Sequence, residues 1–247
     1  MSDPKIDRAH WPEENVIFAV TSLDLKVSPE PHPFHLAEKT AAAENWRLEI
    51  AANPALFDGK MVLQHRVDIR DGAISSQAHV VPFSTFLWWR KTRPPGSALH
   101  LFGLPVILSS DGAVIAIRMG RHTANPGRVY CAAGSIDPDD VVDGRCDING
   151  NMAREVREET GLDLADAFAS PGFHALHGED MVTLFRTYRF QETAEGLIAR
   201  IRAHIETEAQ SEIDEALAIF SADPDLHPYP PFMPRILARI FEGAATH

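Results

Sequence analysis

The chain has 247 residues, 45% of them hydrophobic, so it can bury the core of one large domain or of a catalytic domain with a smaller appendage. Its formal net charge of −12 disfavours nucleic-acid binding, because an acidic protein repels polyanions. No apolar run of about 18 residues indicates a membrane span, and no basic-then-apolar leader opens the sequence. Two cysteines, Cys131 and Cys146, do not form a disulfide framework, which favours a reducing, cytoplasmic location.

The first 96 residues are predicted to form a small α+β region. Two β-rich runs, at 60–69 and 74–81, flank Asp71-Gly72, and Asp-Gly between such runs is a strong hairpin signal. A strand at 16–21, a helix at 36–52 and a short helix at 83–90 complete this region. The aromatic residues of the last segment are expected to serve as core rather than as a base-stacking platform. The Pro-Pro-Gly sequence ending at Gly96 predicts a linker, so we place the domains at 1–96 and 97–247.

The second region opens with two strands around the Asp111-Gly112 turn, and a strand at 128–133 leads into Gly134. Alternation of apolar and polar residues predicts a further strand at 182–190. The remaining predicted elements are a helix at 197–208 and a closing amphipathic helix at 236–241. Between them, the segment 211–220 is acidic at its start and is expected to lead into a strand.

The segment Arg154-Glu155-Val156-Arg157-Glu158-Glu159-Thr160-Gly161-Leu162 concentrates acidic residues on a predicted helix. Glu155, Glu158 and Glu159 fall on one face, because positions i, i+3 and i+4 are neighbours on a helix. Their mutual repulsion would be offset by arginine or by a hard divalent cation such as Mg²⁺, which binds oxygen ligands. The alternative is an ordinary solvated helix face. Asn149 or Asn151 is expected to cap this helix, and Gly161 to end it.

This segment resembles the second half of the Nudix box, the signature of hydrolases that act on nucleoside diphosphates linked to another moiety. All specified positions of that half match. In the first half, Gly134 is present, and Asp140 stands where the family has glutamate. The following gap is six residues longer than the family pattern, so residues 143–150 look like an insertion. Asp140 is therefore either the counterpart of the first box glutamate or a turn-forming residue.

The resemblance implies an α/β fold, a Nudix-type α/β/α sandwich with a mixed β-sheet, here with the small N-terminal α+β extension. It implies Mg²⁺-dependent cleavage of a diphosphate, with Mn²⁺ as a second candidate metal. Glu155, Glu158 and Glu159 would bind the metal, and Arg154 would orient the glutamates. The general base is left open among Glu158, Glu179, Glu208 and Glu212, with Glu158 and Glu212 as the catalytic candidates.

Arginines in the segment 118–130 are candidates for substrate binding, because guanidinium groups pair with phosphate oxygens in a bidentate way. They are Arg118, Arg121 and Arg128, and the alternative is that they are surface charges balancing nearby aspartates. The N-terminal region is loosely similar to that of Nudix proteins that cleave UDP-sugars. A nucleotide sugar is therefore the first substrate expected, and an ADP-ribose-like dinucleotide or coenzyme A the second.

Two alternatives from other classes remain at this point. The atypical glycine loop and the insertion favour a Nudix domain that binds its nucleotide as a sensor without turnover, whereas the intact glutamate triad opposes that interpretation. An isomerase on the same fold would use a cysteine acid, for which Cys131 is the candidate nearest the loop. A small phosphorylated nucleotide is the expected partner, and a homodimer is left open.

Overall fold

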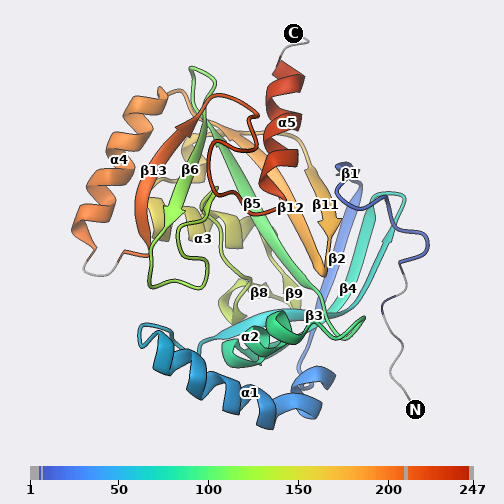
Figure 1. Cartoon of the computed structure of the whole chain (residues 1–247). Helices are drawn as coiled ribbons and strands as arrows, with labels where there is room; N and C mark the ends of the chain where they lie inside the picture. Colours follow the sequence, from blue (N-terminus) through green and yellow to red (C-terminus); the bar gives the residue numbers. More distant parts are fainter. Residues whose placement is uncertain (1–5, 7, 209–210, 245–247) are drawn as a thin grey trace.

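The computed structural model describes residues 6, 8–208 and 211–244, and its largest element is an eight-stranded mixed sheet (Figure 1). Six strands follow the order β1-β11-β12-β5-β6-β13, while β10 pairs with β12 and β7 with β6. The central pair β5–β12 is parallel and the other pairs are antiparallel. The bounds are β1 Phe18–Val20, β5 His100–Leu108, β6 Val114–Met119, β7 Val129–Tyr130, β10 Phe168–Ala169, β11 Phe173–Gly178, β12 Met181–Arg189 and β13 Ile213–Ile219.

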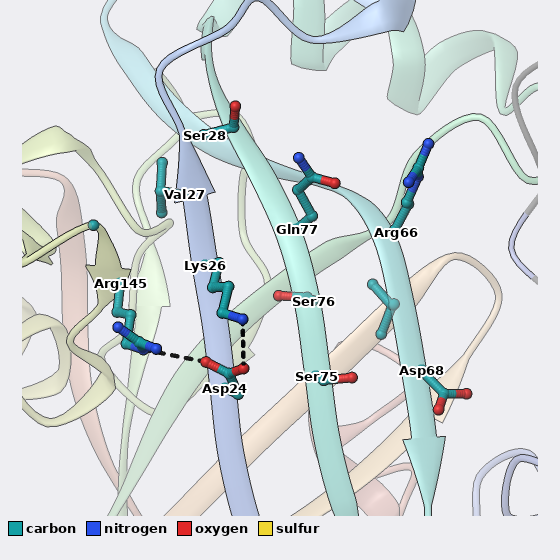
Figure 2. A pocket seen from close by; sticks show the side chains of 12 residues that line it. Asp24, Lys26, Val27, Ser28, Arg66, Asp68, Ser75, Ser76, Gln77 and Arg145 are labelled. Atoms are coloured by element: carbon teal, nitrogen blue, oxygen red, sulfur yellow. Dashed lines mark hydrogen bonds and ion pairs between the residues drawn. The ribbon is translucent and has the colours of Figure 1, made fainter.

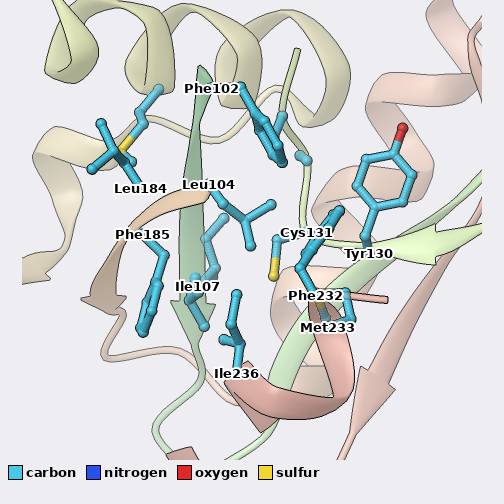
Figure 3. Close-up of a cluster of buried hydrophobic side chains, with 14 of the residues drawn as sticks. Phe102, Leu104, Ile107, Tyr130, Cys131, Leu184, Phe185, Phe232, Met233 and Ile236 are labelled. Atoms are coloured by element: carbon cyan, nitrogen blue, oxygen red, sulfur yellow. The ribbon is translucent and has the colours of Figure 1, made fainter. Parts of the chain in front are cut away.

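Helices cover both faces of this sheet. On one face, α3 (Ile148–Thr160) packs on β5 at Gly103, where an added Cβ would lie 3.0 Å from the Met152 side chain. Helix α4 (Ala194–Thr207) contacts α3, β6 and β13. On the other face, the segment leading into α5 (Met233–Ala244) places Phe232 against Phe102, with ring centroids 5.4 Å apart (Figure 3). The predicted α/β/α sandwich with a mixed sheet is confirmed.

A second, five-stranded sheet has the order β3-β4-β2-β9-β8. The predicted hairpin forms its edge, with positive φ at Asp71 and Gly72 in the turn. Helices α1 (Pro33–Ala52) and α2 (Phe83–Thr92) pack together beside it, and buried Phe86 and Trp89 belong to a separate small core, as expected for the aromatic segment. The strand bounds are β2 Ser22–Ser28, β3 Lys60–Arg70, β4 Ala73–Pro82, β8 Val141–Val142 and β9 Arg145–Cys146.

The two predicted domains exchange strands. β1 from the N-terminal region pairs with β11 of the large sheet, and β9 from the second region pairs with β2 of the small sheet. The Val62 amide also donates to the Ile136 carbonyl at 2.7 Å. The boundary near residue 96 stays a prediction. The hydrogen bonds that cross it connect the N-terminal region to the loop that carries Gly134. Among the helices of the described ranges, none is both long and apolar enough to cross a bilayer.

Candidate active site

Helix α3 carries the acidic segment and is anchored at both ends by local interactions. Its N-cap is Asp147, whose side chain accepts from the Gly150 amide at 3.0 Å, rather than the predicted Asn149 or Asn151. Those asparagines lie inside the helix, because the first turn begins earlier, at Ile148. At the other end, Gly161 adopts φ 68° and closes the helix, as predicted.

The three glutamates of this helix lie in different environments. Ile148, Met152 and Val156 are buried, and Glu155, which lies under the Gly134 loop, is 9% exposed. Glu158 points outward, with 59% of its side chain exposed. Glu159 is enclosed enough that burial raises its pKa well above the ordinary value, with Glu155 and Glu212 adding to the rise. The acidic side of α3 is therefore not a uniformly solvated helix face.

Arg154 connects the acidic groups. Its guanidinium donates to both oxygens of Asp140, at 3.0 Å from Nε and 2.7 Å from Nη2. It also contacts Glu155 and Glu158, each at 2.8 Å. Hydrogen bonds with Asp140 raise the pKa of Arg154, so this group stays protonated. The orienting role predicted for Arg154 fits this geometry, because one rigid fork fixes three carboxylates.

Asp140 is the partner of Arg154 despite the insertion that follows it. Burial opposes its ionisation, but hydrogen bonds from Arg154, the Asp137 amide and Asn151 hold the pKa of Asp140 below its usual value. Asn151 donates to the Asp140 carboxylate at 2.9 Å. Asp140 also takes part in the turn: its carboxylate accepts from the Asp137 amide at 3.0 Å, while the Asp137 side chain accepts from the amides of Asp139 and Asp140.

The insertion leaves this geometry intact because it folds back on itself. Strands β8 and β9 form a hairpin around Asp143 and Gly144, both with positive φ. The Asp147 amide donates to the Asp140 carbonyl at 2.8 Å and closes the base of the hairpin. The hairpin residues 141–146 thus leave the active-site side of the loop and join the small sheet, while Asp140 stays beside α3. The predicted insertion at 143–150 is corrected at its end, because residues 148–150 already form the first turn of α3.

The loop that carries Gly134 packs directly on the helix. A Cβ atom at Gly134 would collide with the carboxylate of Glu155, so a larger residue here would force the Glu155 side chain to move. The side chain of Asn151 donates to the Ser135 carbonyl at 3.3 Å and holds the loop in place. The sequence pattern indicated Gly134, but it did not indicate that Asn151 joins the loop to the helix.

The acidic cluster, defined as Glu155, Glu158, Glu159 and Glu212, has too few cations to balance it. Burial raises the pKa of Glu155 to about 7, opposed by Arg154 and reinforced by Glu158. Oxygen Oε2 of Glu159 is buried and has no hydrogen-bond partner. Glu212 enters from the start of β13, and its carbonyl accepts from the Gly120 amide at 2.7 Å.

Oxygen ligands with surplus negative charge are the donor set that Mg²⁺ and Mn²⁺ prefer, so the residues fit such an ion. Within the described part of the chain, no three His, Cys, Asp or Glu side chains already converge as a ligand set. Arg154 explains this, since its guanidinium holds carboxylate oxygens of both Glu155 and Glu158.

The other proposed general bases lie in separate ion pairs. Glu179 contacts Arg93 at 2.5 Å in the turn between β11 and β12. Glu208 lies 3.4 Å from His204 at the end of α4. Of the four candidate bases, Glu158 and Glu212 act electrostatically on Glu159, as Glu155 also does.

The three arginines predicted to bind substrate are dispersed. Arg118 pairs with Glu215, its cross-strand neighbour, at 3.2 Å, so a surface ion pair already accounts for it. Arg128 donates to the Tyr229 carbonyl at 3.2 Å. Arg121 is exposed in the loop after β6. Their assignment to the substrate stays a prediction.

Residues that the sequence did not single out join the N-terminal region to this loop. Arg90 of α2 donates to the Asn125 side chain and the Ala124 carbonyl, both at 3.2 Å. Asn125 in turn donates to the Tyr130 hydroxyl at 3.3 Å. Burial raises the pKa of Tyr130, and the nearby acidic cluster adds to the rise. The motifs gave no signal for this chain of contacts, because it depends on the packing of α2 against a distant loop.

No family model and no curated protein matches the sequence. Among solved structures, the chain is similar to the MutT protein from Methanosarcina mazei Go1, at 16% identity and TM-score 0.42, over 60% of this chain and 96% of that one.

A bifunctional NMN adenylyltransferase/ADP ribose pyrophosphatase from Francisella tularensis matches at 11% identity and TM-score 0.42, over 64% of this chain and 44% of that one. The Nudix domain of Shewanella oneidensis NrtR, solved with ADP ribose, matches at 13% identity and TM-score 0.38, over 64% and 96%. Sequence identities and TM-scores this low do not bear on the activity of this chain. The solved structures to which this chain is similar include several Nudix proteins.

Proposed function

We propose that the chain is a Nudix hydrolase that cleaves the diphosphate of a nucleoside diphosphate linked to another moiety, with Mg²⁺ or Mn²⁺ as cofactor. The observation that carries the proposal is the buried carboxylate of Glu155, which Arg154 ties to Asp140 beside the Gly134 loop, next to Glu159, whose Oε2 is buried without a hydrogen-bond partner. A purely structural helix face has no need for buried carboxylates, because burial without a matching cation costs free energy.

In this proposal, Glu155, Glu158 and Glu159 hold the metal ion. A bound divalent ion supplies Lewis acidity toward phosphate oxygens and lowers the pKa of water. Arg154 and Asp140 fix the positions of the glutamates, and Gly134 lets the loop approach them. Glu212 or Glu158 receives the proton of the attacking water, since both carboxylates belong to the acidic cluster and the other candidates are paired elsewhere.

The substrate class rests on the N-terminal region. A nucleotide sugar is our first candidate, on the loose resemblance of that region to proteins that cleave UDP-sugars, and an ADP-ribose-like dinucleotide or coenzyme A is the second. The contact of Arg90 with the loop that follows β6 supports a role for this region in shaping the substrate side of the site. Arg121 and Arg128 lie in or next to the same loop and are proposed to contact phosphates.

The test is a panel of UDP-sugars, ADP-ribose and coenzyme A, incubated with Mg²⁺, Mn²⁺ or EDTA. Products are separated and identified by mass, which locates the cleaved bond. We expect a nucleoside monophosphate and a phosphorylated second product with metal, and neither with EDTA. Arg157→Gln, which changes an exposed residue beside the cluster, serves as the matched control and should retain activity. Turnover that persists in EDTA would overturn the proposal.

The sensor alternative is separated by the same panel. Tight binding of one nucleotide, measured by calorimetry, together with no product after prolonged incubation with either metal, would favour the sensor. The isomerase alternative is disfavoured by the position of Cys131, which lies in the apolar core beneath Phe232 and Met233 (Figure 3). Burial raises the pKa of this thiol to about 12, so it is a poor proton donor.

A further inference from the structure

Arg90, in the last turn of α2, is a partly buried cation whose contact partners are all neutral. Its guanidinium donates from Nη1 to the Asn125 side chain and from Nη2 to the Ala124 carbonyl, both at 3.2 Å. Its central carbon lies 5.7 Å from the centroid of the Phe86 ring, a cation–π contact. Within the described ranges, no carboxylate lies at ion-pair distance from Arg90, so its charge has no counter-charge in contact with it.

This environment is unfavourable for the folded chain by itself, because buried cations are usually paired with carboxylates. Burial is the main cause that lowers the pKa of Arg90, the neighbouring Arg93 lowers it further, and Glu49 opposes both. Glu49 is itself in an ion pair with Lys91, at 3.5 Å. A guanidinium stays protonated in proteins. Arg90 therefore keeps its positive charge, and it has N–H donors beyond the two that its hydrogen bonds use.

Two cations of the small sheet are in a different situation. Lys26 and Arg145 line the cavity that Figure 2 shows, and they share the carboxylate of Asp24, at 3.2 Å and 3.1 Å. Their charge is thus already matched within the protein. Arg90 differs because its hydrogen bonds hold the guanidinium in place without neutralising it.

One chain of contacts leads from Arg90 to the acidic cluster. The side chain of Asn125 accepts from Arg90 and donates to the Tyr130 hydroxyl, at 3.3 Å. Burial is the main cause that raises the pKa of Tyr130, and Glu159, Glu212 and Glu155 add to the rise. The hydroxyl is therefore within electrostatic range of the cluster, two hydrogen bonds from the Arg90 guanidinium.

A second chain of contacts leads from Arg90 to the loop that carries Gly134. The Phe86 ring, which lies under the Arg90 guanidinium, packs against His100 with ring centroids 4.8 Å apart. Nε2 of His100 lies 3.2 Å from Oγ of Ser135, the residue after Gly134. Arg90 is thus connected to both loops that lie next to the acidic cluster: the Gly134 loop and the loop between β6 and β7.

We propose that Arg90 binds a phosphate group of the substrate, so that the N-terminal region contributes a binding residue to the site; the inference rests on the proposed hydrolase function. The substrate diphosphate supplies the negative charge that Arg90 lacks among its protein partners. Guanidinium N–H groups form charge-assisted hydrogen bonds with phosphate oxygens, and these are stronger than bonds to neutral acceptors. Because Asn125 and Ala124 already hold the guanidinium, little side-chain freedom is lost when a phosphate binds.

The experiment is steady-state kinetics of the full chain in Mg²⁺, with the compound of the substrate panel that it cleaves fastest. Arg90→Gln should raise KM by about tenfold or more and change kcat much less, because a contact made equally in the bound substrate and in the transition state is lost. Arg90→Lys keeps the charge but not the planar fork, so its KM should fall between the two. Lys91→Gln, the adjacent cation of α2, is the matched control and should keep the parental KM.

Two further measurements separate a contact with substrate from a purely structural role. Asn125→Ala removes one loop contact of Arg90 but keeps the cation, so it should raise KM less than Arg90→Gln does. Equal increases would mean that Arg90 only holds the loop, and the proposal would fail. Calorimetric titration with Mn²⁺ in the absence of nucleotide should give Arg90→Gln the parental affinity, whereas a weakened affinity would show a disturbed acidic cluster and would also overturn the proposal.

The outcomes distinguish this inference from the proposed function. If the parent chain cleaves no compound of the panel, the proposed function fails and the role of Arg90 fails with it. If the parent is active and Arg90→Gln has the parental KM, only the role of Arg90 is refuted. Far-ultraviolet circular dichroism establishes that each variant is folded, and Arg90→Lys carries the test if Arg90→Gln does not fold.

Discussion

The contact between Asp140 and Arg154 gives a sharp prediction, because the sequence left Asp140 unassigned and the structure places it at the centre of the site. The Asp140 side chain is 3% exposed and accepts hydrogen bonds from Arg154, Asn151 and the Asp137 amide. Asp140→Ala removes all of these acceptors at once. It leaves the Arg154 guanidinium with Asp137, Glu155 and Glu158 as remaining partners.

Removing one partner of a buried charge pair costs about 3–5 kcal/mol. The lower end applies here, because the Arg154 side chain is 26% exposed and keeps three carboxylate partners. We therefore expect Asp140→Ala to lower the free energy of unfolding by about 3 kcal/mol. Arg154 would also turn further onto Glu155 and Glu158, so turnover should fall even where the variant is fully folded.

Urea unfolding at pH 7 in EDTA measures the free energy of unfolding, and the substrate panel with Mg²⁺ measures turnover. Asp139→Ala, an exposed neighbour in the same turn, is the matched control and should change the free energy of unfolding by less than about 0.5 kcal/mol. A double-mutant cycle with Arg154→Gln should give a coupling energy of about 1–3 kcal/mol between the two positions. A coupling near zero would refute the pairing, and so would an Asp140→Ala variant as stable as Asp139→Ala.

Three further predictions address the helix, the loop and the buried imidazoles. Glu158→Gln should lower turnover by about 10²–10⁴-fold with little loss of stability, since its side chain is 59% exposed; global unfolding of this variant would favour a structural role. Gly134→Ala should abolish turnover and reduce Mn²⁺ affinity in calorimetry, because the added Cβ collides with the Glu155 carboxylate, and a fully active variant would contradict the loop geometry. Burial, with His65 and His79 nearby, lowers the pKa of His32 to about 3. As the pH drops from about 6.5 toward 3, the unfolded chain therefore binds a proton that the folded chain does not, and the free energy of unfolding falls by up to about 1.4 kcal/mol per pH unit. His32→Asn retains a capping side chain, and its urea-unfolding profile between pH 7 and 4 should fall less steeply than that of the parent; parallel profiles would exclude the assignment.

The local parts of this protein follow from its sequence. The 3.6-residue spacing of Ile148, Met152 and Val156 against the acidic residues fixes both helix α3 and which side of it faces the sheet. Asp71-Gly72 fixes the hairpin of β3 and β4, because only a few residue types accept positive φ in a tight turn. The central strands β5 and β12 are continuous or alternating apolar runs, and their burial follows from that pattern.

The tertiary structure decided what those patterns could not. Whether Asp140 meets Arg154 depends on the path of the inserted residues, and only strand pairing with β2 shows that they form a closed hairpin. The burial of Glu155, set against the exposure of Glu158, comes from the Gly134 loop lying over one side of the helix. Likewise, Arg118 meets Glu215 and Lys26 meets Arg145 only through register between distant strands. Helices and turns are determined by neighbours within a few residues, whereas charge pairing at a site depends on which distant segments the folded chain brings together.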